Sequence, residues 1–126
     1  MVVAHYQHTD NEWHLDIGAT HHLTNDVNNI HLQNEDYGNQ YLIQVANSAG
    51  LKIVQSGTST LSSPSKSFVL QSNFACPRYS KNPLYVQHFC LDNNVFFEFH
   101  VSFFFVKDYL GNILHRGPLS NGLYNF

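Results

Sequence analysis

The chain has 126 residues, of which 43% are hydrophobic and 12% are charged. This is enough apolar material for one compact domain but not for two. The low charged fraction excludes a long charged disordered segment. Six Lys and Arg against nine Asp and Glu give a net charge of -3. That balance argues against nucleic acid as the main partner, because phosphates are neutralised by clustered cations.

The cysteine content and the N-terminus indicate an intracellular protein. Two cysteines, Cys76 and Cys90, are too few for a disulfide framework, and the chain has no C-x-x-C pair. Residues 1–10 lack the apolar run of a signal peptide. No apolar run elsewhere approaches the length of a transmembrane helix. We therefore expect a soluble protein in the cytoplasm, with no membrane partner.

The N-terminal third begins with a polar segment and then shows its first strand signal. Residues 1–11 have no hydrophobic period and are expected to be a disordered lead-in. The segment 13–17 alternates apolar and polar residues and is closed by Gly18, which predicts a strand that runs into a turn. Residues 24–40 are rich in asparagine and predict a long surface loop with one helical turn.

The middle of the chain predicts a hairpin and further strands. Residues 41–45 and 51–54 are strand-like, and the small residues 46–50 between them indicate a turn. Strand character returns at 57–61 and at 68–70.

The C-terminal third predicts one helix and a second hairpin. Apolar residues recur at a ragged helical spacing in 80–91, which predicts a short helix with Pro83 in its first turn. Alternating apolar residues at 95–99 and 103–105 predict a hairpin, and 123–126 predicts a last strand. Short strands at this spacing favour a closed barrel or a sandwich over a parallel sheet.

An aspartate stands at the end of the first predicted strand, in the run Asp16-Ile17-Gly18-Ala19-Thr20. Glycine permits a tight turn whose backbone N–H groups point at the carboxylate. In aspartic proteases two such loops face each other, and the paired carboxylates share one proton. The spacing alone also fits an aspartate that only accepts turn amides, as we expect of the second D-x-G at 36–38.

Motifs spread over most of the chain match those of one known family. Residues 13–26 match its W-x-x-D-S-G-A-T-H-H-x-T-x-D pattern, and 92–99 match its D-N-N-V-x-F-x-F run. Residues 80–86 stand in the place of S-K-N-L-L-S-V, and 111–124 in that of a linker. Over residues 12–126 the chain therefore resembles the protease region of copia-type LTR retrotransposon Pol polyproteins of plants, where it runs into the pre-integrase segment.

This resemblance implies a fold, a domain division and a site. The fold is all-β, a small closed retropepsin-like β-barrel with one short helix. The barrel would span residues 12–92, followed at 93–126 by a β-hairpin segment and a linker toward a missing pre-integrase region. The catalytic residue of the family falls on Asp16, and its loop on Ile17, Gly18, Ala19 and Thr20. The flap over the substrate falls on Ala46, Asn47 and Ser48.

The resemblance also implies how such a protein would act. One chain supplies one catalytic aspartate, so a working pair needs a C2 homodimer. The substrate would be a peptide at a polyprotein junction, and neither a metal nor another cofactor is required. The sequence contains no polymerase or complete integrase, so we expect a fragment of a longer reading frame that cannot transpose alone.

Departures from the family pattern keep an alternative open. Ile17 replaces a Ser or Thr whose hydroxyl helps lock the two loops of related dimers together. Its loss leaves buried acceptors unpaired, at about 1–3 kcal/mol each, and the added bulk costs about 1–3 kcal/mol. Ala46 and Ser48 replace flap glycines, and Pro83 and Tyr85 replace Leu and Ser. The alternative is a catalytically dead β-barrel remnant, or a module that binds peptide without cleaving it.

Two clusters of side chains are expected to be structural. Six histidines could in principle form a metal site together with Cys90, but they lack the H-x-x-x-H spacing of such a site, so we expect them to pack around the candidate site or in loops. The phenylalanines of residues 96–105 have no Arg or Lys interleaved along the chain. We expect them to form core or dimer surface rather than a base-stacking platform. The histidines concerned are His5, His8, His14, His21, His22 and His88.

Overall fold

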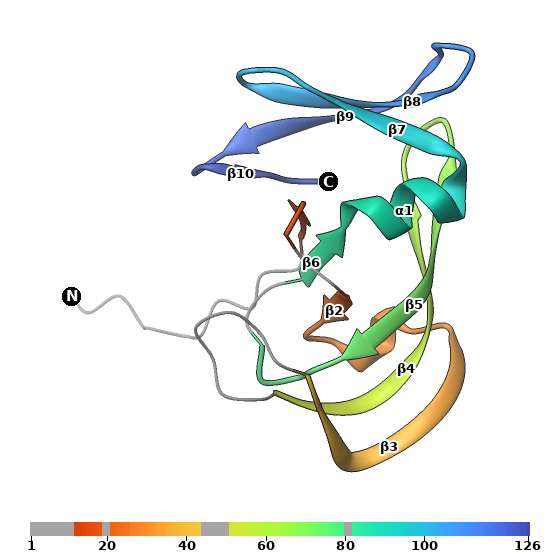
Figure 1. The fold of residues 1–126 in the computed structure, drawn as a ribbon, viewed down its shortest axis with the longest axis vertical. Helices are drawn as coiled ribbons and strands as arrows, with labels where there is room; N and C mark the ends of the chain where they lie inside the picture. The colour runs from red at the N-terminus through yellow and green to blue at the C-terminus, as the bar shows by residue number, and fades with distance from the viewer. Residues whose placement is uncertain (1–11, 19–20, 44–50, 80–81) are drawn as a thin grey trace, which may run out of the picture.

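Strands dominate the computed structural model, which describes residues 12–18, 21–43, 51–79 and 82–126. The predicted all-β class with one short helix is confirmed over these ranges (Figure 1). The elements are β1 (Trp13–Asp16), β2 (His22–Thr24), η1 (Val27–Asn29), β3 (Leu32–Ile43), β4 (Leu51–Ser62), β5 (Ser67–Ala75), β6 (Asn82–Tyr85), α1 (Val86–Asn93), β7 (Val95–Phe99), β8 (Phe103–Asp108), β9 (Ile113–Ser120) and β10 (Leu123–Tyr124).

The described strands form three sheets. One has the order β2-β5-β4-β3, with β2 parallel to β5 and the other pairs antiparallel. The second pairs β1 with β6 in parallel, and the third is the antiparallel sheet β10-β9-β8-β7. Figure 1 shows the third sheet across one end of the molecule, with α1 beneath it and the curled β3–β5 sheet farther away. Closure into one barrel stays a prediction.

The prediction of a long loop over 24–40 is wrong. Its helical turn exists at Val27–Asn29, where the Asp26 carboxylate accepts a hydrogen bond from the Asn28 N–H. The rest of the segment belongs to β3, despite its many asparagines. Antiparallel pairing with β4, interrupted by register shifts, satisfies its backbone, and such pairing overrides residue preference.

The prediction of one helix over 80–91 is also wrong at its start. Pro83 lies in β6, and α1 begins only at Val86. The reason is burial: β6 pairs in parallel with β1, and Leu84 is fully buried in the core. The helix ends at Asn93, and the residue that caps it, Asn94, adopts the left-handed conformation with φ 56°. No helix in the described ranges is long and apolar enough to cross a membrane.

The predicted hairpins are confirmed. β3 pairs with β4, although the predicted turn at 46–50 lies outside the described residues. β7 pairs with β8 in the register Phe97 to Val106, and the His100 N–H donates to the Phe103 carbonyl to close the turn. The predicted last strand forms as β10, antiparallel to β9.

One hydrophobic core joins the N-terminal and C-terminal parts of the chain. Phe68 and Phe89 come from before the predicted boundary at 92 and 93, and Phe104 from after it, and all three are fully buried. The Phe126 ring lies 5.5 Å from that of Phe68 and 5.4 Å from that of Phe89, centroid to centroid. The buried members of this core are Trp13, Leu61, Phe68, Leu70, Leu84, Phe89, Val95, Phe104 and Val106.

We predict that Phe104→Ala lowers the free energy of unfolding of the whole chain by about 3–5 kcal/mol, because it leaves a cavity in the shared core. The neighbouring Phe105→Ala, on the opposite face of β8, should cost only about 1 kcal/mol. Urea denaturation followed by both far-UV circular dichroism and Trp13 fluorescence checks this. Separate transitions for the two signals, or equal costs for the two variants, would contradict the shared core.

Candidate functional site

The predicted catalytic carboxylate lies at the exposed end of β1. Asp16 is the last residue of that strand, and its Oδ1 accepts a hydrogen bond of 3.0 Å from the Gly18 N–H. This is the tight turn that the D-x-G spacing predicts. Between them, the Ile17 side chain is 73% exposed. The loop therefore presents a carboxylate and a large apolar side chain together to solvent.

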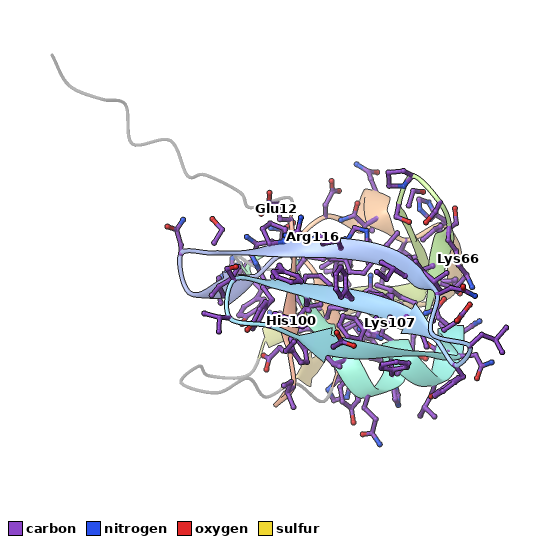
Figure 2. The ribbon with its side chains drawn as sticks, turned by 90° about the horizontal axis from the view of Figure 1, so that it is seen from above. Glu12, Lys66, His100, Lys107 and Arg116 are labelled. Carbon is purple, nitrogen blue, oxygen red and sulfur yellow. The ribbon has the colours of Figure 1, made fainter. Side chains whose placement is uncertain are left out.

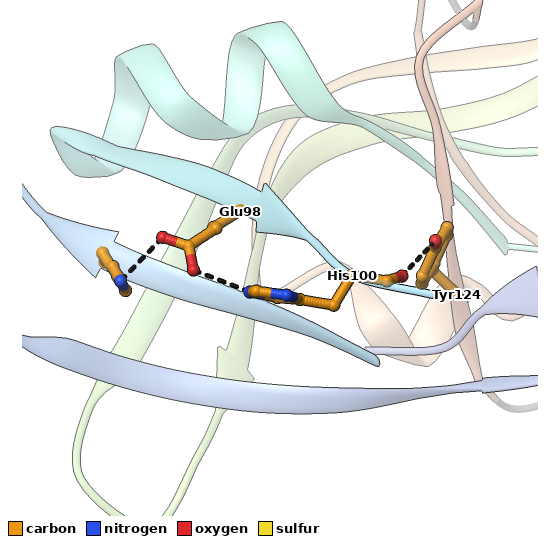
Figure 3. Close-up of polar contacts among 4 residues, drawn as sticks. Glu98, His100 and Tyr124 are labelled. Atoms are coloured by element: carbon orange, nitrogen blue, oxygen red, sulfur yellow. Dashed lines mark hydrogen bonds and ion pairs between the residues drawn. The ribbon is translucent and has the colours of Figure 1, made fainter. Parts of the chain in front are cut away.

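A cavity of about 510 Å³ opens beside this loop. Its other wall consists of Phe99 and Tyr124, from the β7–β10 sheet, so two distant parts of the chain meet at the carboxylate. The Tyr124 hydroxyl donates a 2.7 Å hydrogen bond to the His100 carbonyl, which holds that wall in place (Figure 3). Apolar walls with a few polar groups are typical of ligand sites. The cavity is lined by Leu15, Asp16, Ile17, Gly18, Phe99 and Tyr124.

The strand that carries Asp16 is held along both edges. On one edge β6 pairs with all four of its residues. On the other edge the C-terminus bonds to it: the Phe126 N–H donates to the Trp13 carbonyl at 2.8 Å. His14 forms an isolated bridge with Asn125, and its Nδ1 lies 2.5 Å from the Asn125 Oδ1. The position of Asp16 thus depends on the last residues of the chain.

A hydrogen bond at His22 connects β2, the strand that follows the loop, to β6. His22 is fully buried in β2, and its Nδ1 accepts a 2.8 Å hydrogen bond from the Tyr85 N–H at the end of β6. The proton of the neutral ring is then on Nε2, which has no hydrogen-bond partner among the described residues. Burial lowers the pKa of His22 to about 4, and the nearby charges of His88 and His21 act in the same direction. A packing role was expected for this histidine, but its full burial in a strand was not.

Tyr79 is a neighbour of the site that the sequence did not indicate. Burial raises the pKa of its hydroxyl, and the negative charge of Asp16 raises it further. Its backbone N–H donates to the Cys76 carbonyl in the turn after β5. Tyr79, Phe99 and Tyr124 reach the carboxylate only through tertiary structure, and no local pattern marks them.

The described structure brings together only part of the predicted site. Asp16, Ile17 and Gly18 lie in one turn. Ala19 and Thr20, together with the predicted flap residues, lie outside the described residues. Across the described ranges, no three His, Cys, Asp or Glu side chains gather as a metal site would require. The flap residues concerned are Ala46, Asn47 and Ser48.

Comparison with known proteins gives two curated relatives from Arabidopsis thaliana that align with most of the chain. The Retrovirus-related Pol polyprotein from transposon RE1 is 34% identical over 120 residues, or 94% of this chain. The Retrovirus-related Pol polyprotein from transposon RE2 is 33% identical over 117 residues, or 92%. The chain spans only 8% of the length of each relative. No family model and no solved structure gives a significant match.

These alignments confirm the predicted family. The chain belongs to the retrotransposon Pol polyproteins. Within that family it is similar to one short segment of the copia-type polyprotein, as the D-x-G-A-T-H-H and D-N-N-V motifs predict.

We predict that His22 makes the fold less stable in acid. The unfolded chain binds a proton at His22 below about pH 6.5, whereas the folded chain does so only near pH 4. The free energy of unfolding should therefore fall as the pH is lowered from 6.5 to 4, by about 3 kcal/mol from this group.

Urea denaturation at several pH values checks this prediction. His22→Asn keeps an acceptor for the Tyr85 N–H but cannot titrate, so its stability should fall less than that of the wild type in this window. His31→Asn, at an exposed position that does not contribute to the lowered pKa of His22, is the matched control and should behave like the wild type. A wild type and a His22→Asn variant with the same pH dependence would contradict the assignment.

Proposed function

We propose that the chain is the retropepsin-like aspartic endopeptidase region of its polyprotein and acts as a C2 homodimer. The observation that carries this proposal is the placement of Asp16. It ends a strand, stands exposed in a D-x-G turn, and lines an apolar cavity. Membership in the Pol polyproteins supports the proposal, since such chains contain junctions that must be cleaved.

In the proposed dimer, the two Asp16 carboxylates come close enough to share one proton. One carboxylate then takes a proton from water as the water attacks the peptide carbonyl, and the other protonates the leaving nitrogen. The two groups titrate as a pair. The substrate would bind as an extended strand beneath the flap predicted at 46–48, inside the predicted closed barrel.

A second candidate is a catalytically inactive remnant of the same region. The exposed Ile17 side chain favours it, because this position would lie at the dimer contact and has no hydroxyl to bridge the loops. The Phe126 to Trp13 hydrogen bond favours it as well, since the chain's own C-terminus occupies the free edge of β1. The two candidates share the fold and differ in association and chemistry.

We predict that the intact chain sediments as a dimer and cleaves peptides derived from polyprotein junctions at mildly acidic pH. Asp16→Asn, which keeps the size of the side chain, should abolish cleavage and leave the sedimentation unchanged. Ile17→Ser should strengthen the dimer, because it restores a hydroxyl and removes bulk worth about 1–3 kcal/mol.

The outcomes separate the two candidates. A wild type that is monomeric and inactive, with activity gained only in Ile17→Ser, would support the remnant and identify Ile17 as its cause. Cleavage that survives Asp16→Asn would contradict the assignment of the catalytic residue. Asp108→Asn is a suitable control for the loss of a carboxylate, because Asp108 caps a turn far along the chain from the loop.

A further inference from the structure

The β7–β10 sheet has a second face that points away from the core. Along β8, Phe104 and Val106 are buried, and the residues that alternate with them point to the opposite side. Pairing places Glu98 of β7 and Arg116 of β9 opposite Phe105, on that same side. Figure 2 looks onto this outer face. Its central residues are Glu98, His100, Phe103, Phe105, Lys107 and Arg116.

On the outer face, Phe103 of β8 lies between two other planar side chains, His100 from the turn after β7 and Arg116 from β9. The rings of His100 and Phe103 are 4.5 Å apart, centroid to centroid, with 14° between their planes. The guanidinium carbon of Arg116 lies 4.4 Å from the Phe103 centroid. Because β8 lies between β7 and β9, Phe103 is the middle of this column. His100 and Arg116 are its ends, and both are exposed.

The charges on this face are mostly positive. The Lys107 ammonium lies 5.4 Å from the centroid of the Phe105 ring and donates a 2.7 Å hydrogen bond to Glu98. The second Glu98 oxygen lies 2.7 Å from the His100 Nε2, as Figure 3 shows. These two hydrogen bonds lower the pKa of Glu98, so its charge is present and already matched. Among the described residues Arg116 forms no ion pair with a carboxylate.

We propose that the outer face of the β7–β10 sheet binds single-stranded nucleic acid. Unpaired bases stack on aromatic rings, imidazoles and guanidinium planes, and the exposed planes of His100 and Arg116 extend the column in both directions. The Arg116 guanidinium supplies a cation for a phosphate beside a stacked base, whereas the Lys107 ammonium is already paired with Glu98. This proposal does not depend on the peptidase activity, because the face lies on the far side of the sheet from the cavity wall.

From the sequence alone, nucleic acid is not expected to be the main partner. That expectation depends on the net charge of the whole chain and on the residues next to each phenylalanine along the chain. The cations that approach Phe103 and Phe105 come from elsewhere: Arg116 lies on the next strand, and Lys107 lies two positions further along β8. A sheet interleaves such residues across its strands, so the local charge differs in sign from the overall charge.

We predict that the intact chain raises the fluorescence anisotropy of a short labelled oligouridylate. One phosphate contact, from Arg116, should make log K fall with log salt with a slope of about -0.7. Phe103→Ala should weaken binding by about tenfold, because it removes the ring that positions the stacking planes of His100 and Arg116, and Arg116→Gln should weaken binding and flatten the salt slope. Lys66→Gln removes the same charge from the turn before β5 and should bind like the wild type. Circular dichroism and thermal melting of each variant show that it is folded.

Three results would overturn the proposal. The first is no change in anisotropy with folded wild-type protein at low salt. The second is an equal loss in Arg116→Gln and Lys66→Gln, which would show that only net charge matters. The third is sedimentation in which Phe103→Ala weakens self-association while oligouridylate binding is unchanged, since the face would then be occupied by a second copy of the chain.

Discussion

The structure depends on the way β1 is held between β6 and the C-terminal residues. A strand of four residues contributes little by itself, yet β1 is paired on both edges and carries Trp13 into the core. The hydrogen bond from Phe126 and the bridge to Asn125 tie the beginning of the described chain to its end. The carboxylate of Asp16 is therefore positioned by long-range contacts to β1 as well as by the hydrogen bond from Gly18 in its own loop.

This arrangement connects the candidate site with the β7–β10 sheet. On the inner face of the sheet, Phe104 and Val106 pack in the shared core. Phe99 and Tyr124 of the same sheet line the cavity beside Asp16. In the proposed dimer, a second subunit at the loop would meet this aromatic wall as well as the exposed loop itself. The proposed association and the proposed catalysis would then respond to changes in the C-terminal residues, which the D-x-G motif alone does not indicate.

The sequence could predict features that are encoded locally. The end of β1, the turn at Gly18, both hairpins and the family all follow from patterns within a few residues. The sequence did not predict features that depend on pairing between distant segments. β3 forms in an asparagine-rich segment because β4 pairs with it, and Pro83 lies in a strand because β6 pairs with β1. The burial of His22 and the wall of the cavity were likewise beyond reach, since both arise from segments far apart in the chain.

Native-state hydrogen exchange tests the central claim most directly, because it measures the opening free energy of each amide. If β1 and the C-terminal sheet form one unit, the amides of Leu15, Leu84 and Val106 should exchange only through global unfolding, with equal opening free energies, and the Phe126 amide should share their protection. A β7–β10 sheet whose amides exchange through a separate opening of much lower free energy, while β1 and β6 stay protected, would contradict the account.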